Sequence, residues 1–176
     1  AGDVPRGAGL SSSAAVELAV ARAFCASSNF AWEAVHMAKI SQRAENHWVG
    51  VQCGIMDQMA SAASKQGHAL FLACRTLEIQ HAPMPIGAAV VVMDTSTRRG
   101  LVESAYNERR SQCEEAARAF GVKALRDVGV DGLEGGKRKV ESDIVWKRAR
   151  HIITENQRTL DAVEAMRAND VVKVGK

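Results

Sequence analysis

The chain has 176 residues, of which 47% are hydrophobic and 24% charged, and its formal net charge is +3. This composition allows one packed domain, or one domain with part of another, and excludes a largely disordered chain. The small positive charge does not indicate a nucleic-acid partner, and no apolar run reaches the roughly 18 residues of a membrane span. We therefore expect neither nucleic acid nor membrane as a partner.

The cysteines are widely spaced and form no C-x-x-C pair, which argues against a disulfide framework or a metal site of that type. The sequence predicts reduced, buried thiols in a cytoplasmic protein, and shows no signal-peptide pattern. The four residues are Cys25, Cys53, Cys74 and Cys113. The chain starts at Ala1 without methionine and within a motif, so we expect residues to be missing upstream.

Three helices are predicted in the first third of the chain. An apolar stripe and several alanines predict a helix over residues 12–26. A second helix is expected over 31–47, ended by Gly50. A short helix is expected to follow Asp57 and to reach about Ser64.

Strand patterns follow. Residues 68–73 form an apolar strand candidate, and residues 77–80 alternate with period two, as in a half-buried strand. Pro83 and Pro85 indicate a turn. The continuous apolar run over 88–93 is typical of a strand buried on both faces.

The remainder of the chain has a helical pattern. Residues 101–120 predict a helix ended by Gly121, which is a typical C-cap residue. Residues 131–136 are glycine-rich and are expected to form a loop. A long apolar periodicity over 141–168 predicts one further helix.

The stretch VPRGAGLSSSAA, residues 4–15, places two glycines and three serines directly before the first helix. Gly7 and Gly9 permit positive φ and a close approach of the backbone to a ligand. The unpaired N–H groups and the dipole of a helix start favour phosphate, and serine hydroxyls over 11–13 add donors. A plain N-cap after a turning loop explains the same residues. The stretch lacks the Gly-Lys-Ser/Thr ending of a Walker A loop.

Together with several other segments, this stretch resembles the GHMP small-molecule kinases, and within them the galactokinase family. The resemblance implies an α+β, two-domain GHMP kinase-like architecture with a ribosomal protein S5 domain 2-like N-terminal part, incomplete at both ends. It implies that residues 1–95 are the remainder of an N-terminal ATP- and sugar-binding domain and 96–176 part of a helical C-terminal domain. The similar segments are residues 4–14, 44–46, 53–58, 68–77, 104–110 and 147–151.

The resemblance also assigns a nucleotide site. It implies that ATP phosphates bind the loop made of Gly7, Ala8, Gly9, Leu10, Ser11, Ser12 and Ser13. It further implies that the hydroxyl of Ser13 and the carboxylate of Glu45 hold Mg²⁺, an ion that prefers hard oxygen ligands. From the residues alone, Glu45 is a solvated charge paired with Lys39 or Arg43.

The sugar site is implied by three further residues. Asp57 resembles the family's acid–base residue, which faces the anomeric hydroxyl of the sugar, although an aspartate before a helix is also a common N-cap. Tyr106 resembles the tyrosine that lies against the bound sugar; on its own it is a half-buried aromatic residue. Gly54 allows backbone groups to approach the sugar.

The implied reaction is phosphoryl transfer from ATP to O1 of D-galactose. In the family, an arginine near the reacting phosphate and the acidic and histidine residues that bind the sugar belong to an earlier segment, which these residues do not include. A later glycine-rich motif, which supports the nucleotide loop, is not among these residues either. We therefore expect little activity from these 176 residues alone. A kinase for N-acetylgalactosamine, arabinose or another small alcohol, a non-catalytic sugar and ATP sensor, and a truncated product without function remain alternatives. The oligomeric state is not predicted.

Overall fold

The computed structural model describes residues 2–94 and 102–176, without the side chains of 102–105. The chain divides into two compact units, Ala1–Gly100 and Leu101–Lys176. The predicted domain boundary between residues 95 and 96 lies outside the described residues.

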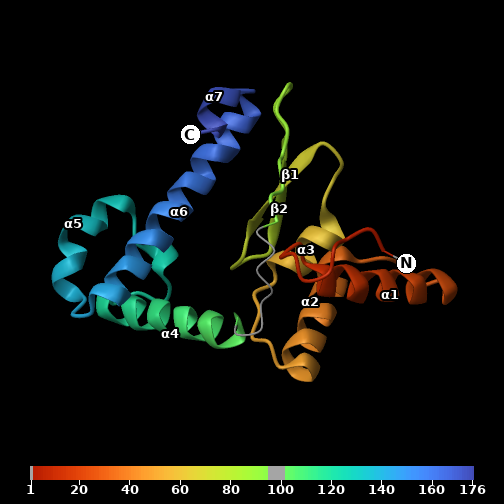
Figure 1. Cartoon of the computed structure of the whole chain (residues 1–176), viewed down its shortest axis with the longest axis horizontal. Helices are drawn as coiled ribbons and strands as arrows, with labels where there is room; N and C mark the ends of the chain where they lie inside the picture. The colour runs from red at the N-terminus through yellow and green to blue at the C-terminus, as the bar shows by residue number, and fades with distance from the viewer. Residues whose placement is uncertain (1, 95–101) are drawn as a thin grey trace. The chain divides into compact units, whose positions relative to one another are not determined.

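Within residues 2–94, the first unit contains three α-helices, one π-helical turn and a β-hairpin. Figure 1 labels the helices α1 to α3 and the strands β1 and β2 of this unit. The predicted helix over 12–26 and the predicted strand over 68–73 are confirmed. In chain order the elements are α1 (Ser12–Ser27), α2 (Ala34–Ala44), η1 (Glu45–Val49), α3 (Met56–Ala63), β1 (His68–Ala73) and β2 (Glu78–Pro83).

The core of this unit lies between the helices and the hairpin. Ala38 of α2 and Met59 of α3 are completely buried, and Leu72 of β1 is nearly so. Partly buried apolar side chains surround this cluster, and α1 packs against both α2 and α3. α3 contacts α1, α2 and β1, so these elements together fix its position within the unit.

The two strands form an antiparallel hairpin in which His68 faces Pro83 and Ala73 faces Glu78. The strand predicted over 77–80 therefore begins one residue later and extends to Pro83. Leu77 has a φ of 62°, and its N–H donates to the carbonyl of Ala73 at 2.8 Å, which closes the turn.

The prediction of a strand over 88–93 is wrong. These residues form no regular structure, and Val90 and Met93 are 76% and 83% exposed. A strand buried on both faces needs neighbours in its sheet and layers above and below it. Within the described residues the sheet contains β1 and β2 alone, so this run has no partner strand.

Two helix predictions are right in position but wrong in extent. The helix expected over 31–47 begins at Ala34 and changes at Glu45 into the π-helical turn η1, which ends at Gly50 with a φ of 85°. The helix expected after Asp57 begins two residues earlier, at Met56, and Ile55 occupies the N-cap position. Asp57 is therefore not an N-cap.

The second unit is helical. The helices predicted over 101–120 and 141–168 are confirmed as α4 (Val102–Phe120) and α6 (Asp143–Arg167), which pack against each other. Gly121 ends α4 with a φ of 73°, and the hydroxyl of Ser142 accepts the N–H of Val145 at the start of α6. The buried core consists of Ala116, Ala117, Leu125, Val140, Val145, Ala149 and Ile153.

The loop predicted over 131–136 is wrong, because its backbone is helical. It contains the end of a 3₁₀ turn and a short α-helix, and the glycines do not interrupt either. Gly136 is buried against Phe120 and Trp146, where a Cβ would lie 2.4 Å from the Phe120 ring. The short elements are η2 (Leu125–Asp127), η3 (Val130–Gly132), α5 (Leu133–Gly136), η4 (Lys137–Lys139) and α7 (Val171–Val174).

All four cysteines are free thiols, as the sequence predicts. The expectation that they are buried is wrong for Cys74, which is exposed. Among the described helices, none combines the length and the apolar character needed to cross a bilayer.

Candidate functional site

The loop that leads into α1 has left-handed backbone at alternate positions. Gly7, Gly9 and Ser11 have φ values of 70°, 75° and 58°. The positive φ predicted for the two glycines is confirmed, whereas the left-handed conformation of Ser11 is unusual for a residue with a Cβ. Left-handed residues within such a loop help to turn backbone N–H groups toward a common point, which suits an anion.

The start of α1 is available to such an anion. Ser11 is the N-cap residue, yet its side chain makes no capping hydrogen bond, and the first turn holds no acidic residue. The first N–H groups of the 16-residue helix therefore lack the usual side-chain acceptor. Their partial positive charge favours phosphate at this position.

Ser13 and Glu45 are brought together from two separate elements. The Ser13 hydroxyl donates a hydrogen bond to Glu45 Oε1 at 2.9 Å, although the two residues are 32 positions apart. The interpretation of Glu45 as a solvated charge paired with Lys39 or Arg43 is thus wrong. The structure instead directs this carboxylate toward the start of α1.

The π-helical turn determines where Glu45 lies. Glu45 is the first residue of η1, and its carbonyl accepts the N–H of Gly50 at 3.0 Å, a bond that spans five residues. A π-helical turn is rare, and such turns occur frequently at functional sites. The left-handed Gly50 ends this turn and starts the loop that leads to α3.

The second oxygen of Glu45 is held from α3. Gln58 Nε2 donates to Glu45 Oε2 at 2.7 Å, and the Cys53 thiol lies 3.7 Å from the same oxygen. The thiol also lies 3.3 Å from Asn46 Oδ1. Burial, first of all, and then the charge of Glu45 raise the pKa of Cys53, so the thiol is protonated and can donate.

A second carboxylate approaches this cluster from α1. Glu17 lies one helical turn after Ser13, and its Oε2 is buried without a hydrogen-bond partner within the described residues. Burial and then the charge of Glu45 raise the pKa of Glu17, while a hydrogen bond from Gln58 opposes the shift. Within the described residues, neither Glu17 nor Glu45 has an ion-pair partner.

The sequence pattern alone predicts no role for Glu17 or Gln58. Gln58 was part of a recognised segment, and the four-residue spacing from Ser13 placed Glu17 on the Ser13 face of α1. That spacing was the available signal for Glu17. No sequence pattern indicated that the Gln58 amide reaches Glu45.

Asp57 lies in the first turn of α3, directly before Gln58. Its side chain is exposed, and its carboxylate has no hydrogen-bond or ion-pair partner among the described residues of the first unit, 2–94. The next residue, Gln58, connects this turn of α3 to the Ser13–Glu45 pair through its hydrogen bond to Glu45. The carboxylate of Asp57 itself is accessible to a ligand. Gly54 is exposed in the loop just before α3.

Tyr106 lies in α4 of the second unit and is 43% exposed. This exposure agrees with the half-buried aromatic residue that the sequence alone indicates.

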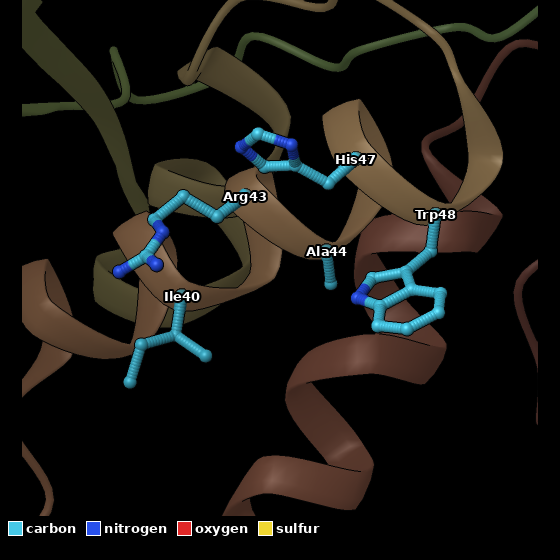
Figure 2. Close-up of a pocket in the computed structure, with 5 residues that line it drawn as sticks. All are labelled: Ile40, Arg43, Ala44, His47 and Trp48. Atoms are coloured by element: carbon cyan, nitrogen blue, oxygen red, sulfur yellow. The ribbon is translucent and has the colours of Figure 1, made fainter.

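A pocket of about 370 Å³ adjoins the serine loop. Ser12, Arg6 and Val4 contribute to its wall, together with Val16 and other residues of α1. A larger pocket, of about 590 Å³, lies along α2 and η1 (Figure 2). It is lined by Ile40, Arg43, Ala44, His47 and Trp48, none of which was a predicted site residue.

Residues 1–65, which contain the serine loop, Glu45 and Asp57, match the family described as "GHMP kinases N terminal domain". Over 99% of its length the chain is similar to the Lactococcus lactis galactokinase whose crystal structure was determined with galactose, with a TM-score of 0.86 and 30% sequence identity. The chain is galactokinase-like and has the GHMP kinase fold.

This galactokinase-like chain spans 46% of the length of the Lactococcus lactis chain. The matched family region ends shortly after α3, so it includes all the elements that form the Ser13–Glu45–Gln58 cluster.

The oxygens at the cluster suit a magnesium ion. Ser13 and Glu45 offer a hydroxyl and a carboxylate 2.9 Å apart, and both are hard ligands. Among the described residues, no group of three or more His, Cys, Asp or Glu side chains is arranged to bind a metal. Mg²⁺ commonly binds one or two protein oxygens and completes its shell with phosphates and water.

Proposed function

We propose that this galactokinase-like chain serves phosphoryl transfer from ATP to O1 of D-galactose, giving galactose 1-phosphate. The observation that carries the proposal is the hydrogen bond between Ser13 and Glu45 at the start of α1. It joins a phosphate-binding type of loop to a carboxylate suited to Mg²⁺. The Lactococcus lactis relative, which was crystallised with galactose, supports a sugar as the acceptor.

In this proposal the loop from Gly7 to Ser13 binds the ATP phosphates through backbone N–H groups and serine hydroxyls. The apolar side of the adjoining pocket, which includes Val4 and Val16, suits the base of the nucleotide. Ser13 and Glu45 would hold Mg²⁺. When bound, this ion neutralises charge on the phosphate oxygens as the phosphoryl group moves.

Asp57 would act on the sugar. Its carboxylate is exposed and unpaired, so it can accept the proton of the attacking hydroxyl or orient that hydroxyl. Gly54, just before α3, would let backbone groups approach the sugar. Tyr106 of the second unit would orient the sugar with its ring and hydroxyl.

The remaining proposals concern organisation and setting. Residues 1–95 would belong to the ATP- and sugar-binding domain and 96–176 to a helical C-terminal domain. Four free cysteines suit a reducing compartment, and we propose the cytoplasm.

The test measures transfer of label from [γ-³²P]ATP to D-galactose, N-acetylgalactosamine and L-arabinose by the 176-residue chain, alongside calorimetric titration with ATP and Mg²⁺. We expect ATP to bind with a dissociation constant below about 1 mM. Transfer should favour galactose and be slower than about one turnover per second. Absence of ATP binding would refute the nucleotide site, and a preference for another sugar would refute the assignment of galactose.

A further inference from the structure

Gln58 is a polar residue at a buried position of α3. Its side chain is completely buried, next to the equally buried Met59, in the first half of α3. A buried amide needs hydrogen-bond partners, because it has lost those offered by water. Here Nε2 has Glu45 Oε2 at 2.7 Å, and Oε1 has no partner within the described residues. The Cys53 sulfur lies 3.8 Å from the same nitrogen, so the bond to Glu45 is the shorter of the two contacts of this amide.

The two oxygens of Glu45 have different partners. Oε1 receives the hydroxyl of Ser13 at 2.9 Å, and Oε2 receives the amide of Gln58 at 2.7 Å. These donors come from α1 and α3, so they fix the plane of the carboxylate from both sides. Since Ser13 would share a cation with Glu45, Oε1 is the oxygen on the cation side. The Gln58 amide occupies the other oxygen.

A second carboxyl group lies in the same cluster as Glu45. Glu17 is the second acidic group of the cluster, and the charge of Glu45 acts on it. A like charge nearby favours the neutral form of a carboxyl group, and a neutral hydrogen-bond donor eases the repulsion between the two. Gln58 supplies such a donor without a charge of its own, and so leaves the cluster attractive to a cation.

We propose that Gln58 is a positioning residue, which holds the Glu45 carboxylate so that Oε1 and the Ser13 hydroxyl can bind Mg²⁺ with ATP. This inference rests on the proposed function. It adds that the first turn of α3 serves both halves of the reaction. Asp57 faces the acceptor side from this turn, and the next residue orients the metal-binding carboxylate.

The experiment compares wild type with Gln58→Met and the control Gln52→Met, which makes the same change at an exposed position. ATP affinity is measured by calorimetry with Mg²⁺ and again with EDTA. We expect Gln58→Met to reduce the gain in affinity that Mg²⁺ provides by about tenfold, as loss of a hydrogen bond to a metal ligand commonly does. The affinity for metal-free ATP should change by less than about twofold. Gln52→Met should match wild type in both titrations.

A Gln58→Met protein that keeps the full magnesium gain overturns the inference and leaves the proposed function intact. A wild-type chain that fails to bind ATP, or that gains nothing from Mg²⁺, overturns both. If Gln58→Met does not fold, the side-chain amide of Gln58 is followed by NMR in wild type. Slow exchange and a shift when Mg²⁺ joins ATP support the inference, whereas rapid exchange in the free protein overturns it.

Discussion

The Ser13 hydroxyl donates to Glu45 Oε1 at 2.9 Å across 32 positions of sequence. This bond joins the start of α1 to the π-helical turn η1, and Gln58 joins α3 to the same carboxylate. The anion-binding end of a helix and a metal-type carboxylate are thus adjacent. The position of Asp57 is set by the same packing of α3, because Asp57 directly precedes Gln58 in that helix.

Asp57→Asn should reduce transfer of phosphate to galactose by about 10² to 10⁴-fold, because the amide cannot accept the hydroxyl proton. ATP binding should persist, since the Asp57 carboxylate does not contact Ser13 or Glu45 in the structure. Label transfer and calorimetry measure the two effects. Glu78→Gln, the same type of change at an exposed strand position, is the control. Equal transfer by Asp57→Asn and wild type would remove Asp57 from the mechanism.

Met59→Ala should destabilise the protein by about 2–5 kcal/mol, because the side chain is completely buried between α2, α3 and β1. The matched control is Met56→Ala in the same helix, where the side chain is 48% exposed and the cost should stay within about 0.5 kcal/mol. Urea unfolding measures both. Similar losses for the two variants would contradict the described packing of α3.

Glu17→Gln should raise the melting temperature at pH 7. Burial raises the pKa of Glu17 in the folded protein above its value in the unfolded chain, so ionisation at neutral pH costs stability. The carboxyl of Glu17 makes its full contribution to the free energy of unfolding below its pKa in the unfolded chain, which is about 4.3. This contribution is lost as the pH rises through the pKa of the group in the folded protein. The advantage of the variant should therefore shrink toward pH 4. Scanning calorimetry at both pH values checks this. A melting-temperature advantage of Glu17→Gln that grows toward pH 4 would contradict the raised pKa of Glu17.

Cys113 should react slowly with iodoacetamide at pH 8. Burial raises the pKa of its thiol against the opposing charge of Arg148, and the thiolate is the reactive form. Mass spectrometry can compare Cys113 with the exposed Cys74 in one sample. The rate at Cys113 should rise toward pH 10, and unfolding should bring the two rates together at pH 8. Faster labelling of Cys113 in the folded chain would contradict the burial described here.

Much of the fold was predictable from local pattern. The apolar stripes of α1, α4 and α6 are long, and glycine ends α4, so their limits follow from periodicity and capping. The run over 88–93 was mispredicted because an apolar strand pattern says nothing about whether partner strands exist. The change from α2 to η1 was also not predictable, since it is a shift in backbone hydrogen bonding with no residue signature.

Part of the candidate site could be predicted from residue type, and part only from the family resemblance. The positive φ of Gly7 and Gly9 follows from residue type, but the pairing of Ser13 with Glu45 was expected from the resemblance alone. Gln58 was missed, because a single amide in an amphipathic helix gives no indication of which way it faces. Such contacts depend on how three helices pack, and spacing along one helix cannot reveal them.

The most direct test measures how much Mg²⁺ strengthens ATP binding in wild type and in Ser13→Ala, with Ser28→Ala at the far end of α1 as control. We predict that wild type and Ser28→Ala bind ATP more tightly with Mg²⁺ than with EDTA, and that Ser13→Ala loses most of this gain. An unchanged gain in Ser13→Ala would contradict the placement of the nucleotide and its metal at the start of α1.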